Sequence, residues 1–179
     1  MYACGDTVVY RHHVCEVAAL REDYFEGKDY FELRTLFENS LKLFVAVDEA
    51  APPTLRPVMT KHEALALIDS MADADSIDEE TLRPDAPTPT LLERRFKEEY
   101  ERRLKTFAPQ DLVPIMKSVH DRTARRVDSG RRITATDKKY FDLAEGLLCD
   151  ELAVSLSIPR DEVKSVLVER VKRAEAHRS

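Results

Sequence analysis

Hydrophobic and polar residues alternate over much of the first 60 positions, which is the pattern of half-buried β-strands. A loose loop is expected at residues 23–29, around Gly27, and a tight hairpin turn at 38–40. Pro57 restricts the last strand to a sheet edge, because proline has no N–H to donate. The predicted strands cover residues 7–10, 14–20, 30–37, 41–47 and 55–59. Five short strands with little helix indicate a small antiparallel β-barrel of the Tudor or SH3 type.

From residue 60 onward the apolar positions recur every three or four residues, which predicts helices. A helix is expected at 60–73, where Thr60 caps the first turn and Glu63 completes a capping box. Four further helices are expected to begin near residues 90, 111, 134–136 and 157–160. The chain therefore belongs to the α+β class, with a barrel followed by an all-α domain.

The stretch 74–89 is acidic and then proline-rich, and three prolines at 84, 87 and 89 disfavour both helix and central strand. It is predicted to be a linker between an N-terminal domain at 1–73 and a four-helix domain at 90–179. Thr90 is the expected N-cap of the first helix after the linker, with Glu93 at the capping-box position.

The formal charge of −6 is unevenly distributed. Residues 1–84 carry 8 Lys and Arg against 17 Asp and Glu, a net of −9, whereas residues 85–179 carry 20 against 17, a net of +3. Two modules with different partners are expected, and any affinity of the second for DNA should be weak unless another protein delivers it. No signal peptide or membrane span is predicted, and three scattered cysteines are typical of reduced cytoplasmic thiols, so a cytoplasmic protein without a membrane partner is expected. The protein is also expected to be a monomer.

Neither a metal site nor a catalytic site is predicted. Four possible zinc ligands, Cys4, His12, His13 and Cys15, are spaced unlike any common zinc finger, and adjacent histidines in a strand point to opposite faces. The chain has no glycine-rich phosphate loop, G-x-S-x-G or H-E-x-x-H motif. A non-catalytic protein without a cofactor is therefore expected.

Basic residues in the second half are candidates for contacts with nucleic-acid phosphates. Arg94 and Arg95 are predicted to lie in the first turn of a helix, without an acidic residue one turn earlier, where cations are disfavoured unless an anion compensates them. Leu92 is either a packed leucine or an exposed wedge for a base step. Further candidates come from two other basic clusters and comprise Arg125, Arg126, Lys138 and Lys139.

In the fourth strand, alternation places Lys42, Phe44 and Ala46 on the outer face. Glu32 and Arg34 have the outer parity of the third strand. A single exposed Phe is common on protein surfaces. An exposed Phe surrounded by a polar rim is also the pattern of a protein-binding site.

Four stretches of the sequence have the motifs of one protein family. GDTVVYRHH at 5–13 is similar to G-D-x-V-V-Y-P-x-H-G, the opening strand of the CarD/CdnL family of bacterial transcription regulators. LKLFVAVDEAAPPTLRPVM at 41–59 resembles its last barrel strands, and LERRFKEEYERRL at 92–104 resembles its W-x-x-R-[YF]-K helix start. ITATDKKYFDLAEGLLCDELA at 133–153 resembles its L-S-x-x-E-K helix, so the likeness extends over almost the whole chain.

The resemblance implies a Tudor-like domain that binds the RNA polymerase β subunit and a helical domain that contacts promoter DNA at the upstream edge of the bubble. It places Arg34, Lys42 and Phe44 in the polymerase contact, and Leu92, Arg94 and Arg95 in the DNA contact. The sequence departs from the family where Phe44 replaces a basic residue and where Leu92 replaces a tryptophan, and the chain contains no Trp. The alternative is a divergent protein-interaction module that binds polymerase or another partner without contacting DNA.

Overall fold

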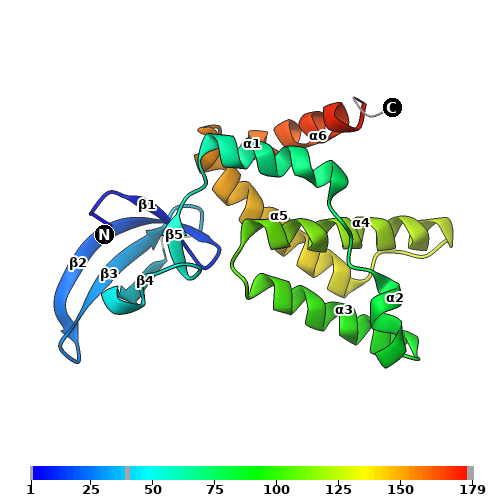
Figure 1. Cartoon of the computed structure of the whole chain (residues 1–179), viewed down its shortest axis with the longest axis horizontal. Helices are drawn as coiled ribbons and strands as arrows, with labels where there is room; N and C mark the ends of the chain where they lie inside the picture. Colours follow the sequence, from blue (N-terminus) through cyan, green and yellow to red (C-terminus); the bar gives the residue numbers. More distant parts are fainter. Residues whose placement is uncertain (1, 39–40, 177–179) are drawn as a thin grey trace. The chain divides into compact units, whose positions relative to one another are not determined.

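The computed structural model describes residues 2–38 and 41–176 and has an α+β fold (Figure 1). Its N-terminal part is a five-stranded antiparallel sheet in the order β4-β3-β2-β1-β5. The strands are β1 (Thr7–Tyr10), β2 (His13–Phe25), β3 (Lys28–Thr35), β4 (Lys42–Ala46) and β5 (Leu55–Pro57). β4 and β5 are the two edges of an open sheet, so the predicted closure into a barrel is not found.

The alternation predicted for the strands decides which face of the sheet is buried. Phe31, Leu33 and Val45 pack with residues of β1, β2 and β5 into one apolar cluster. Pro57 lies on an edge strand, as predicted, because β5 pairs only with β1 among the described strands.

Strand β2 is longer than predicted, and its connection to β3 is tighter. Phe25 pairs with Lys28, which leaves only Glu26 and Gly27 in the turn, at φ values of 52° and 71°. Positive φ at both central residues is the requirement of a type I′ hairpin, whose twist matches that of the strands. The turn predicted at 38–40 includes Asn39 and Ser40, which lie outside the described residues.

Six α-helices follow the sheet within the described part of the chain, together with short 3₁₀ turns such as η3 (Arg83–Asp85). Thr60 and Glu63 form the predicted capping box: the Glu63 N–H donates to Thr60 Oγ1 (3.2 Å), and the Thr60 N–H donates to Glu63 Oε2 (2.8 Å). The helices are α1 (Lys61–Ser70), α2 (Glu79–Leu82), α3 (Pro89–Leu104), α4 (Leu112–Asp128), α5 (Ala135–Leu156) and α6 (Arg160–Ala176).

Helix α3 begins earlier than predicted. Thr88, not Thr90, is the N-cap, and its Oγ1 accepts the Leu91 N–H at 3.3 Å. Pro89 is the first helical residue, where its fixed φ suits the helix and its missing N–H leaves no hydrogen bond unmade. Arg94 is consequently the sixth residue of α3 and lies in its second turn, so the unfavourable first-turn position assigned to the arginines was wrong.

The chain forms two compact units, one of residues 1–64 and 149–163 and the other of residues 65–148 and 164–179. In the first unit, the buried Glu151 carboxylate accepts two hydrogen bonds from Arg56 (2.6 and 2.7 Å) and one from the Met59 N–H (3.1 Å). Residues 149–163 thus group with the sheet, and the division into domains at 1–73 and 90–179 stays a prediction. The linker role of 74–89 stays a prediction, and part of that stretch folds as α2 and η3.

Candidate functional site

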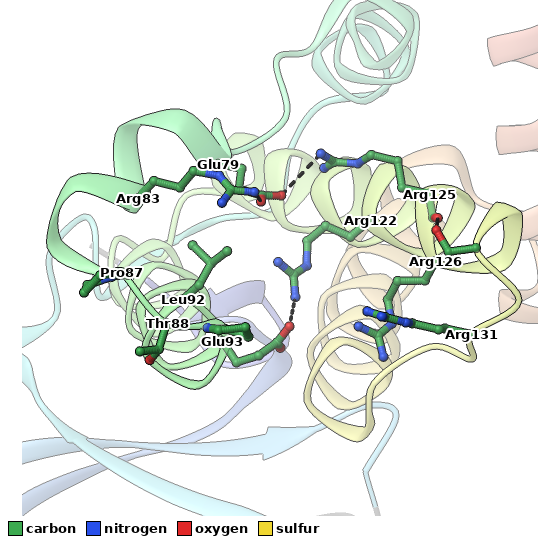
Figure 2. A pocket seen from close by; sticks show the side chains of 13 residues that line it. Glu79, Arg83, Pro87, Thr88, Leu92, Glu93, Arg122, Arg125, Arg126 and Arg131 are labelled. Carbon is green, nitrogen blue, oxygen red and sulfur yellow. Dashed lines mark hydrogen bonds and ion pairs between the residues drawn. The ribbon is translucent and has the colours of Figure 1, made fainter.

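An arginine-lined pocket of about 460 Å³ lies among α2, the start of α3 and the end of α4 (Figure 2). It contains three residues predicted to contact DNA, Leu92, Arg125 and Arg126. Leu92 is half-buried, which leaves part of its side chain on the pocket surface. Three further arginines line the pocket, namely Arg83, Arg122 and Arg131.

Arg122 is buried although it carries a charge, and only 6% of it is exposed. Its Nε donates to Asp137 Oδ2 (3.2 Å), its Nη2 donates to Glu93 Oε1 (2.5 Å), and its guanidinium carbon lies 3.7 Å from the centre of the Phe96 ring. Asp137 is fully buried and also accepts the Tyr100 hydroxyl at 3.0 Å. Burial and the neighbouring Asp137 carboxylate raise the pKa of Tyr100, so this hydroxyl stays a donor.

The acidic residues of the pocket neutralise only part of its positive charge. Glu79 pairs with Arg83 and, at 3.3 Å, with Arg125. Arg126 donates to the backbone carbonyl of Arg132 (2.8 Å) and has no carboxylate partner among the described residues. Arg131 has no side-chain hydrogen bond or ion pair within residues 2–38 and 41–176. Positive charge therefore remains available on the α4 side of the pocket.

The other residues predicted to bind DNA lie outside this pocket and are mostly paired. Arg94 Nε donates to Glu98 Oε1 (2.8 Å), and Arg95 pairs with Asp85 (3.3 Å) and Glu98 (3.2 Å). These contacts, led by the Arg94 hydrogen bond, hold the pKa of Glu98 below its ordinary value. The availability of Arg94 and Arg95 was predicted from the absence of an acidic residue one turn before them, whereas their partner Glu98 lies one turn after them.

The lysine pair at the start of α5 is also occupied. Lys138 pairs with Asp142 at 2.7 Å, and Lys139 Nζ lies 5.6 Å from the centre of the Tyr140 ring. Neither lysine lines the arginine pocket.

Sequence reasoning did not assign a role to Arg83, Glu79 or Glu93 in this pocket. Arg122 was not among the predicted DNA contacts, but it falls seven residues after Ile115 and three after Val119, both buried on α4. That helical spacing was the available signal that its side chain points inward.

The outer face of the sheet carries an aromatic patch, defined by Tyr24, Tyr30 and Phe44. The rings of Tyr24 and Phe44 stack at 4.8 Å with an interplanar angle of 10°, and Tyr30 meets Tyr24 edge-on at 5.7 Å. Phe44 is 40% exposed and Tyr24 is 51% exposed. The predicted outward orientation of Phe44 is confirmed, whereas Tyr24 was missed because it falls in the stretch expected to be a loop.

Charged residues next to the aromatic patch form an ion cluster. Glu32 pairs with Phe44 in register, but it is only 4% exposed because Arg21 (2.6 Å) and Lys42 (3.3 Å) cover its carboxylate. Arg21 and then Lys42 hold the pKa of Glu32 below its ordinary value. Arg34 is exposed and, among the described residues, has no side-chain hydrogen bond or ion pair. Ala46, predicted to face outward, is buried.

The four residues considered as zinc ligands are not brought together as a metal site. Across residues 2–38 and 41–176, no group of three His, Cys, Asp or Glu side chains has an arrangement that would hold a metal ion. Cys15 is buried, Cys4 is exposed, and His13 Nδ1 lies 3.2 Å from Glu38 Oε1.

A scan against protein-family models found no match, and a search of curated proteins found none either. No helix in the described part of the chain is both long and apolar enough to cross a bilayer. The residues predicted to bind partners contribute to two surfaces described above, the aromatic patch beside edge strand β4 and the arginine pocket.

Proposed function

We propose that the protein is a non-catalytic transcription regulator that binds the RNA polymerase β subunit through its sheet and promoter DNA, near the upstream edge of the bubble, through its helices. The observation that carries the proposal is the meeting of Leu92, Arg125 and Arg126 in one pocket with three further arginines. Guanidinium groups are suited to phosphate oxygens, because their planar N–H groups donate in pairs. The half-buried leucine beside them offers an apolar contact at a base step.

The open sheet would serve as a Tudor-like docking module. Its edge strand β4 presents one row of backbone N–H and C=O groups with no partner strand among the described residues, next to the aromatic patch and to Arg34 and Lys42. Exposed aromatic rings surrounded by charges are the composition of protein interfaces. The low net charge of the second half suits a protein that polymerase delivers to DNA, because tethering raises its local concentration.

The polymerase contact is tested by retention of polymerase from cell extract on the immobilised protein, with and without nuclease. Wild type should retain the polymerase after nuclease treatment, and Phe44→Asp should not, because a carboxylate cannot pack against an apolar partner surface. Phe25→Asp, a similarly exposed aromatic of the same sheet, is the matched control. Release of polymerase from the wild type by nuclease alone would refute the polymerase contact.

The DNA contact is tested by a salt titration of affinity for fork-junction DNA, with and without polymerase. Arg125→Ala/Arg126→Ala should reduce the slope of log affinity against log salt by about 0.9 for each phosphate that the variant no longer binds. Arg94→Ala/Arg95→Ala removes the same charge from two residues that both pair with acids, whereas Arg126 has no described carboxylate partner, so this variant should have the smaller effect. Equal slopes for wild type and both variants would exclude DNA from this surface.

A second candidate is a protein-interaction module that binds polymerase, or another partner, without DNA. It is favoured by the ion pairs of Arg94 and Arg95 and by the absence of tryptophan from the chain. Polymerase retention that depends on Phe44, together with unchanged salt slopes in the arginine variants, would select this candidate.

A further inference from the structure

The arginine pocket is concave and small, whereas duplex DNA presents its phosphates along the outside of a wide cylinder. A duplex phosphate can reach the rim of such a pocket, but it cannot fill the interior. The volume of about 460 Å³ lies within the range of about 300–1,000 Å³ that is typical of small-molecule sites. Its interior is thus of a size that suits a small ligand.

Three arginines of the pocket share one face of α4. Arg125 and Arg126 follow Arg122 by three and four residues, the spacings at which helical side chains are neighbours. Like charges at this spacing repel each other unless an anion lies between them. Glu93 and Asp137 compensate Arg122, and Glu79 compensates Arg125, but no described carboxylate contacts Arg126. Arg131, from the loop after α4, adds a second uncompensated guanidinium.

The opposite wall of the pocket carries an apolar strip next to the charged residues Glu79, Arg83 and Glu93 (Figure 2). Ala86, Pro87, Pro89 and Leu92 form this strip, and the prolines fix the backbone there. Figure 2 shows Leu92 and Pro87 on one side, Arg126 and Arg131 on the other, and Arg122 extending between them. A ligand that fills this pocket has several anionic oxygens at one end and a less polar body at the other.

We propose that the arginine pocket binds a free nucleoside polyphosphate, with its phosphates at Arg126 and Arg131 and its nucleoside against the wall formed by Pro87 and Leu92. Two adjacent guanidinium groups match the charge of a diphosphate better than that of a single phosphodiester. Thr88 and Pro89 place the positive end of the α3 dipole on the same lining, which favours an anion further. Because the pocket also contributes to the proposed DNA contact, a bound nucleotide would compete with DNA for the same arginines.

Isothermal titration calorimetry of the full chain, without DNA or polymerase and at low salt, tests the site with ATP, ADP, inorganic pyrophosphate and adenosine. We expect one ATP or ADP per chain, weaker binding of pyrophosphate, and no binding of adenosine. Arg126→Ala/Arg131→Ala should lower ATP affinity by about a hundredfold, roughly tenfold for each charged contact. Leu92→Ser should lower the affinity for ATP and leave the affinity for pyrophosphate unchanged.

Arg102→Ala/Arg173→Ala removes the same charge from exposed positions outside the pocket and should change ATP affinity by less than about twofold. Equal decreases in ATP affinity in the two double variants would show that ATP is attracted by the overall charge of the chain, and would refute the proposed site. So would the absence of heat with ATP and pyrophosphate from a wild-type chain whose circular dichroism shows it to be folded. If the chain binds ATP but not DNA, the proposed DNA contact is refuted and the nucleotide site is supported. If it binds DNA but not ATP, the nucleotide site is refuted and the DNA contact is supported.

Discussion

Replacing Asp137 by alanine should destabilise the helical unit more than any exposed substitution. The carboxylate is fully buried and accepts hydrogen bonds from Arg122 Nε (3.2 Å) and the Tyr100 hydroxyl (3.0 Å). Its removal leaves a guanidinium with only 7% of its side chain exposed and a buried hydroxyl without this acceptor. Breaking a buried ion pair costs about 3–5 kcal/mol, and the lower value is expected because Glu93 still contacts Arg122 at 2.5 Å.

The assay is urea unfolding followed by circular dichroism at 222 nm, a wavelength at which helices dominate the signal. With a slope of about 2 kcal/mol/M, a destabilisation of about 3 kcal/mol lowers the midpoint by about 1.5 M. Asp142→Ala is the matched control, because Asp142 lies on the same helix with an exposed carboxylate paired to Lys138 at 2.7 Å. The control should be destabilised by less than about 1 kcal/mol.

The double variant Asp137→Ala/Arg122→Met separates a broken ion pair from a simple decrease in packing. Removing both partners takes the uncompensated charge out of the interior, so the double variant should be more stable than Asp137→Ala. If Asp137→Ala falls within about 1 kcal/mol of the wild type, or if the double variant is no more stable than the single one, the buried network does not hold Arg122 as argued.

Two further predictions concern the cap of α3 and the cysteines. Thr88→Ala should lower the free energy of unfolding in urea by about 0.5–2 kcal/mol, because Thr88 accepts the Leu91 N–H. Thr90→Ala should lower it markedly less, and equal decreases would contradict the assigned start of the helix. Burial raises the pKa of the Cys15 thiol to about 11, so iodoacetamide at pH 8 should label the exposed Cys4 and spare Cys15, as peptide mass spectrometry would show. Because the pKa is raised on folding, this thiol favours the folded state fully below about pH 9, and that contribution is lost as the pH rises through about 11.

The strands were predicted well where one face is buried. Phe31, Leu33 and Val45 lie on the buried face, as the alternation predicts, although Glu32 and Ala46 of the other parity are also buried. The continuation of β2 beyond Leu20 was missed because that part of the hairpin is exposed on both faces, and Arg21, Glu22 and Asp23 there have the composition of a loop. Its strand conformation comes from pairing with β3, which the local sequence does not encode.

The cap of α3 was misplaced by two residues because prolines were treated only as helix breakers. Pro89 favours the helix when it is the first helical residue, and it assigns the N-cap to the residue before it, Thr88. The shift moved Arg94 out of the first turn and removed the electrostatic reason for selecting it. Because the helix begins two residues earlier than predicted, Arg94 is no longer the arginine expected to need an anion.

The distribution of acids along the chain explains why the arginines differ in availability. On α3, Arg94 and Arg103 each have a glutamate four residues away, so the helix itself brings a carboxylate to the guanidinium. Arg126 and Arg131 stand at and beyond the end of α4, where no acid at that spacing contacts them among the described residues. The net charge of +3 for residues 85–179 averages over both kinds of arginine. It conceals four arginines and one glutamate of the pocket, to which the preceding segment adds Arg83 and Glu79. In a chain with this many charges, an anion site is therefore recognised by the cationic side chains that have no acidic partner on their own helix. Which cations these are depends on the residue at which each helix ends.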